Sequence, residues 1–109
     1  LGGGLALAIA ESLGALGDPQ ATPVLLELLA AELEILKRGE SYTTAVAAVA
    51  EALGRIGDPV AIPALEQALA WFSKTDFSEG SQFIADESGL SIRRALVRLR
   101  HRQVDERTP

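Results

Sequence analysis

Residues 45–72 repeat the pattern of residues 5–32 at an offset of 40 positions. Each copy has an apolar segment, a Gly-Asp-Pro triplet and a second apolar segment, with the triplets at Gly17–Pro19 and Gly57–Pro59. A unit of this length cannot bury its hydrophobic face alone, so such repeats stack on one another. The repeat therefore predicts a solenoid and argues against most other folds.

The residues around each triplet predict a helix, a tight turn and a second helix. Apolar residues recur at helical spacing before and after it. Glycine suits the positive φ that ends a helix, aspartate caps the next helix, and proline fits a first helical position, where no N–H is needed. We expect first helices ending at Leu16 and Ile56, and second helices over about 20–37 and 60–73.

A third copy begins after a break in the pattern. Residues 74–88 show no sustained period and are expected to form an insertion, with a connection of unusual length. Ile92, Ala95, Leu96 and Leu99 then reproduce the spacing of Val46, Val49, Ala50 and Leu53 at an offset of 46. This predicts a last helix over 89–103 and a polar tail over 104–109.

The chain is therefore expected to form one all-α domain, an α-solenoid of five helices in about two and a half repeats. Repeat one covers about 5–38 and repeat two about 41–73. Hydrophobic residues make up 48% of the chain and aromatic residues only 5%, which suits closely packed helices of Ala, Leu, Ile and Val. The chain does not begin with Met, and we expect it to be part of a longer solenoid.

The second copy of the motif, within Glu51–Leu65, resembles the bacterial HEAT-like repeats first named from phycobilisome lyases. The first copy, Glu11–Leu25, fits with Thr22 and Val24 in place of Ile62 and Ala64. The resemblance implies antiparallel helix pairs whose second helices form the concave, binding side. The third copy departs from the family pattern because it has no Gly-Asp-Pro.

This resemblance places a protein-binding surface on the second helices and the 74–88 insertion. Trp71 is the only tryptophan, and tryptophan is enriched among interface hot spots. The alternative for Trp71 and Phe72 is packing beneath the long connection. The candidate binding residues are Leu26, Glu27, Ala30, Glu34, Glu66, Gln67, Ala70, Trp71, Lys74, Phe77, Phe83, Arg94 and Arg98.

The sequence offers no catalytic constellation, so we expect no catalytic residues, no metal site and no cofactor. There is no Cys, and His101 is the one histidine, in a basic stretch where a structural role is expected. Asp18 and Asp58 recur in the repeat and are interpreted as helix caps. The serines have no base partner in the sequence pattern.

The charge distribution argues against nucleic acid as a partner. Residues 1–88 carry 13 acidic and 4 basic side chains, whereas residues 89–109 carry 6 basic and 2 acidic ones. The acidic part would repel phosphates. The arginines of the last helix either form a solvated face or pair with an acidic surface on a partner or on another copy.

We therefore expect a non-enzymatic scaffold that binds another protein. The alternative is a subunit of a bilin lyase or isomerase acting on phycobiliproteins, which the resemblance alone suggests. No apolar run reaches the length of a membrane span and no signal peptide is recognisable, so a cytoplasmic location is expected. The apolar residues at the start of the chain also leave self-association through the solenoid ends open.

Overall fold

The computed structural model describes residues 3–38, 45–75 and 79–107, and within them it contains helices and turns without a strand. Two short 3₁₀ turns, η1 (Pro19–Ala21) and η2 (Pro59–Ala61), lead into the second helix of each copy. The α-helices are α1 (Gly3–Leu16), α2 (Thr22–Lys37), α3 (Ala45–Ile56), α4 (Ile62–Lys74) and α5 (Glu79–Arg107). The prediction of an all-α solenoid of five helices is confirmed.

The turns of the two copies have the same geometry. Gly17 and Gly57 have φ angles of 67° and 79°, a conformation that favours glycine. The Asp18 side chain accepts a hydrogen bond from the backbone N–H of Gln20 at 2.9 Å, and Asp58 accepts the equivalent bond from Val60 at 3.1 Å. The aspartates thus cap the 3₁₀ turns, so α2 and α4 begin about two residues after the predicted positions.

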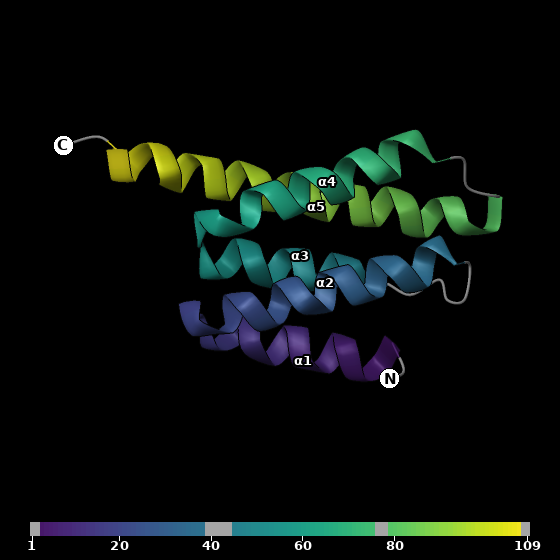
Figure 1. Ribbon diagram of the computed structural model, residues 1–109, viewed down its shortest axis with the longest axis horizontal. Coiled ribbons are helices and arrows are strands. Elements are labelled where there is room, and N and C mark those ends of the chain that lie inside the picture. The colour runs from purple at the N-terminus through teal and green to yellow at the C-terminus, as the bar shows by residue number, and fades with distance from the viewer. Residues whose placement is uncertain (1–2, 39–44, 76–78, 108–109) are drawn as a thin grey trace.

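The helices form two layers (Figure 1). In the first-helix layer α3 lies between α1 and α5 and contacts both. In the second-helix layer α2 packs against α3, and α4 packs against α5. The stack runs from α1 at the bottom of the view to α4 and α5 at the top. Each second helix therefore also covers the first helix of the following repeat, which joins the repeats into one core.

Small residues set the close spacing of the first-helix layer. A Cβ atom added at Gly14 of α1 would lie 2.9 Å from the Cβ of Ala52 in α3. One added at Gly54 of α3 would lie 3.1 Å from the Cα of Ala95 in α5. The missing side chains let the helix backbones approach each other closely. Leu25, Leu29, Leu53 and Leu65 fill the core between the layers and are fully buried.

The last helix is longer than predicted. It begins at Glu79 and ends at Arg107, so most of the expected 74–88 insertion and part of the expected tail are helical. The prediction of a long connection was therefore wrong. Among the described side chains of α5, the buried residues before Ile92 are Ala85, Ser88, Gly89 and Ser91. Small and polar residues at these positions conceal the helical period from an analysis of apolar spacing.

No helix in the described ranges combines the length and the apolar character that crossing a membrane requires.

A candidate protein-binding groove on the second helices

A groove of about 210 Å³ runs between α2 and α4, on the second-helix layer. Positions spaced by three and four residues bring one face of each helix to it. The residues of α2 form one wall and those of α4 the other. The lining residues are Leu26, Leu29, Ala30, Leu33, Glu34, Lys37, Ala64, Gln67, Ala68 and Trp71.

Trp71 is fixed at one end of this groove. Its ring meets the Phe72 ring edge-on, with centroids 4.9 Å apart and an interplanar angle of 71°. The Thr75 hydroxyl donates a hydrogen bond to the Trp71 carbonyl oxygen at 2.7 Å, where α4 ends. Phe72 is buried in the core, whereas Trp71 is half-buried and lines the groove. The two aromatic residues therefore have different environments, which the sequence did not distinguish.

The rim near Trp71 is charged. The Lys37 ammonium nitrogen lies 5.9 Å from the centroid of the Trp71 ring, a distance at which a cation is attracted to the ring face. The same nitrogen lies 3.7 Å from a carboxylate oxygen of Glu34. Both charged side chains remain about half exposed, so this pair orients the rim more than it stabilises the fold.

Five of the predicted binding residues meet in this groove: Leu26, Ala30, Glu34, Gln67 and Trp71. Glu27, Ala70 and Lys74 are exposed on the same two helices but do not line it. They fall just beyond the arc that the lining positions occupy around each helix.

The remaining predicted residues lie elsewhere. Glu66 accepts a hydrogen bond from Arg100 of α5 at 2.9 Å and forms an ion pair with it. Arg94 and Arg98 line a hollow between α3 and α5. Phe77 lies outside the described residues, and Phe83 belongs to α5 although its side chain is not described.

Sequence reasoning did not place five of the lining residues on the binding surface: Leu29, Leu33, Lys37, Ala64 and Ala68. The signal was present for α2, because positions 26, 30, 33 and 37 follow one helical face. Lys37 lies in the last turn of α2, where a basic side chain is also favoured by the helix dipole and so does not by itself indicate a binding site. Ala64 was overlooked because alanine carries no distinctive chemistry, and only the packed position of α4 identifies it as part of the wall.

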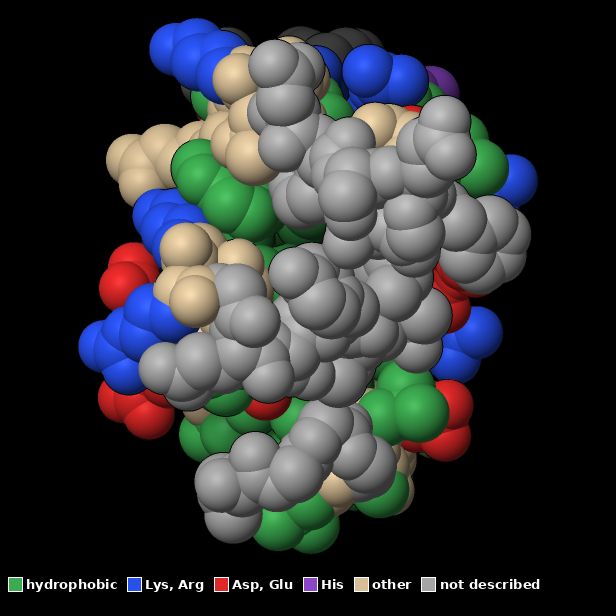
Figure 2. Space-filling view, turned by 90° about the vertical axis from the view of Figure 1, so that its right-hand side faces the viewer, with side chains coloured by type: hydrophobic (Ala, Val, Ile, Leu, Met, Phe, Trp, Pro, Cys, Tyr) green, Lys and Arg blue, Asp and Glu red, His purple; other side chains and the backbone are tan. Residues whose placement is uncertain are grey.

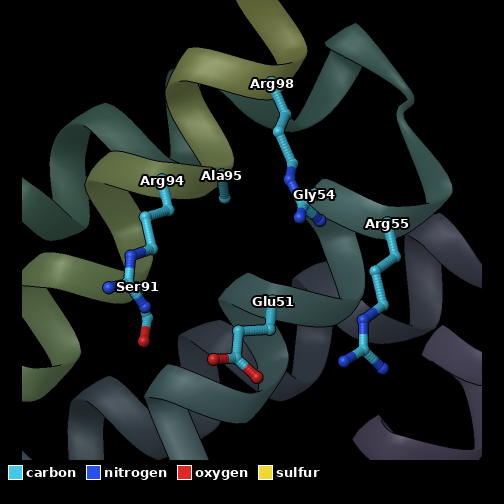
Figure 3. Close-up of a pocket in the computed structure, with 7 residues that line it drawn as sticks. All are labelled: Glu51, Gly54, Arg55, Ser91, Arg94, Ala95 and Arg98. Carbon is cyan, nitrogen blue, oxygen red and sulfur yellow. The ribbon is translucent and has the colours of Figure 1, made fainter.

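Two further hollows lie along α5. The first, of about 140 Å³, lies between α3 and α5, and Figure 3 shows Arg94 and Arg98 on one side of it and Glu51 on the other. The second, of about 500 Å³, lies where α4 ends and α5 begins and includes Phe72, Thr75, Gln82 and Asp86. The Gln82 amide donates a hydrogen bond to Asp86 at 2.8 Å.

Glu32 is a buried carboxyl group in α2 and is only 4% exposed. Desolvation by burial raises its pKa above the ordinary value of 4.5. It does not line the groove. Among the described residues no cluster of His, Cys, Asp and Glu has the arrangement of a metal site.

Comparison with known proteins identifies the repeat. The model of the PBS lyase HEAT-like repeat family matches the chain twice, at residues 5–31 and 45–70. No curated protein and no solved structure matches it. The two matched segments cover most of α1 and the first part of α2, and all of α3 and most of α4, together with the turns that join each pair. The chain therefore carries two HEAT-like repeats of the PBS lyase HEAT-like family.

Proposed function

We propose that this protein is a non-enzymatic scaffold that binds a partner protein in the groove between α2 and α4. The proposal rests on one observation: the apolar residues that line the groove and the charged residues on its rim meet at Trp71. We place this function in the cytoplasm. The hollow at the start of α5 extends the proposed surface to the segment around residues 79–88.

The shape and chemistry of the groove favour an amphipathic helix as the bound element. Leu26, Leu29 and Leu33 form an apolar strip along α2, opposite the small side chains Ala64 and Ala68 of α4. Helices that bind in grooves present aliphatic residues at spacings of three and four. The volume of about 210 Å³ is below the roughly 300–1,000 Å³ of small-molecule pockets. This difference favours a peptide over a bilin.

The single tryptophan makes the proposal testable by fluorescence. Amphipathic helical peptides selected by display against the 109-residue protein would be titrated into it while Trp71 emission is recorded. We expect binding to shift the emission to shorter wavelength, because an apolar helix in the groove removes water from the ring. Ala30→Glu should weaken binding about tenfold or more, since it places a charge in the apolar contact.

Ala31→Glu is the matched control, because Ala31 is exposed on the same helix but does not line the groove. It should leave the affinity within about twofold of the unmodified protein. Selected peptides that bind equally to both variants, without changing Trp71 emission, would show that the groove is not the binding site. A covalent bilin adduct on incubation with bilin and apo-phycobiliprotein would replace the scaffold with the lyase alternative.

A further inference from the structure

The outer surface of α5 carries a group of arginines around one aliphatic residue. Arg93, Arg94, Val97 and Arg98 form this surface, here called the arginine face, and Val97 is 67% exposed. Arg94 and Arg98 also border the hollow between α3 and α5. In Figure 3 Arg98 extends toward Gly54 and Arg94 runs beside Ser91, so both cations reach the hollow from the same helix.

The positive charges of this face are not neutralised within the structure. Neither Arg93, Arg94 nor Arg98 forms a hydrogen bond or ion pair with another residue that the structure describes. Arg100, two residues beyond Arg98, is paired with Glu66 at 2.9 Å. Like charges four residues apart on a helix destabilise it by a few tenths of a kcal/mol. The arrangement therefore has a small electrostatic cost that an anionic ligand would remove.

The repeat architecture does not require these arginines. At the offset of 46, the equivalents of Arg93, Arg94 and Arg98 in α3 are Ala47, Ala48 and Ala52. In α1, at a further offset of 40, they are Leu7, Ala8 and Ser12. The positions hold uncharged residues in both other first helices. Packing between repeats thus accounts for small or apolar residues at these three positions. It does not account for the arginines that α5 has there, which need another explanation.

We propose that the arginine face binds an acidic segment of a partner protein. Guanidinium groups accept carboxylates in a bidentate geometry, and clusters of them recognise acidic motifs. Val97, between the cations, offers an apolar contact to an aliphatic residue of the same segment. This site lies on α5, away from the groove between α2 and α4, and is independent of the function proposed for it.

The size and surroundings of the face favour a short acidic peptide over nucleic acid. Glu51 lines the adjoining hollow, and residues 1–88 carry 13 acidic against 4 basic side chains. A phosphate backbone longer than the face would extend over this acidic body and be repelled. Charges are mixed elsewhere: Figure 2, which views the helices from one end, shows Lys and Arg beside Asp and Glu along its left-hand edge.

The test compares three probes on the intact chain by fluorescence anisotropy. The first is a labelled twelve-residue peptide of glutamates around a central leucine, the second has glutamine in place of every glutamate, and the third is single-stranded DNA of the same length. We expect the acidic peptide to bind at least about tenfold more tightly than the glutamine peptide. Arg94→Gln with Arg98→Gln should weaken that binding by about tenfold or more.

The matched control is Arg38→Gln with Lys74→Gln. It removes the same number of positive charges at two exposed positions, one directly after α2 and one at the end of α4. It should change the affinity by less than about threefold, because distant charges are screened. Arg94→Lys with Arg98→Lys keeps the charge and should give an intermediate loss. Equal losses in the glutamine variant and the control, or tighter binding of DNA than of the acidic peptide, would overturn the proposal. Circular dichroism checks that each variant is folded.

Discussion

Position 32 of the first copy buries a glutamate, whereas the equivalent position of the second copy, 72, buries a phenylalanine. A similar difference separates Thr22, whose hydroxyl is buried without a partner among the described residues, from Ile62. The turns of the two copies nevertheless have the same geometry. One backbone pattern thus tolerates different cores, and we infer that the first copy is the less stable of the two.

The largest expected effect distinguishes the two glycine contacts. Gly54→Leu should destabilise the protein by about 3 kcal/mol, because the side chain would meet the Ala95 backbone of α5. Gly14→Leu should cost less, since α1 lies at one edge of its layer and can shift, whereas α3 is held between α1 and α5. Urea denaturation measures both. Equal losses would show that the position of a helix in the stack does not matter.

Replacing the buried carboxyl group should stabilise the first copy. Glu32→Leu is expected to add on the order of 2 kcal/mol at neutral pH, because it removes a desolvated charge. The folded pKa of Glu32 is raised, so its penalty is absent below the unfolded pKa and grows as the pH rises through the folded value. The gain measured by thermal unfolding should therefore be smaller at pH 4 than at pH 8. A gain independent of pH would point to packing alone.

Thr22→Val should also stabilise the first copy, by about 1.5 kcal/mol, because it removes an unpartnered hydroxyl while keeping the shape of the side chain. Thr75→Val is the matched control. Its hydroxyl donates to the Trp71 carbonyl oxygen, so its removal should destabilise the protein instead. Melting temperatures of the two variants should move in opposite directions. A fall in both would mean that the Thr22 hydroxyl is satisfied.

The smallest expected effects concern the caps, where the copies agree. Asp18→Ala and Asp58→Ala should each cost about 1 kcal/mol, because each removes one side-chain hydrogen bond to a backbone N–H. The two losses should match within about 0.5 kcal/mol. Asp18→Asn and Asp58→Asn, which keep the acceptor, should restore most of the stability. A cap that mattered in one copy alone would contradict the equal geometry.

The sequence was most informative where one residue type has one physical use. Glycine at positive φ, aspartate as a cap and proline in the first turn located both turns to within about two residues. It was least informative where small residues are buried. Ser88 is fully buried in α5, yet serine does not mark a core position, and so the start of the helix was missed.

The candidate groove was foreseen only in part for a similar reason. Trp71 and Leu26 stand out because of their size and spacing, and they do line the groove. Ala64 and Lys37 take part because α2 and α4 lie next to each other across the stack, a relation between segments that local spacing does not contain. That Arg94 and Arg98 line the same hollow as Glu51 likewise depends on the packing of α5 against α3.

The glycine–alanine contacts of the first-helix layer have a mechanical consequence for the opposite layer. We expect the close contacts of Gly14 with Ala52 and of Gly54 with Ala95 to act as pivots about which neighbouring repeats tilt. The groove lies on the far side of these pivots, so a small change of angle there is magnified into a change in its aperture. For the partner binding proposed above, residues outside the groove would thereby help to set which partners it is wide enough to admit.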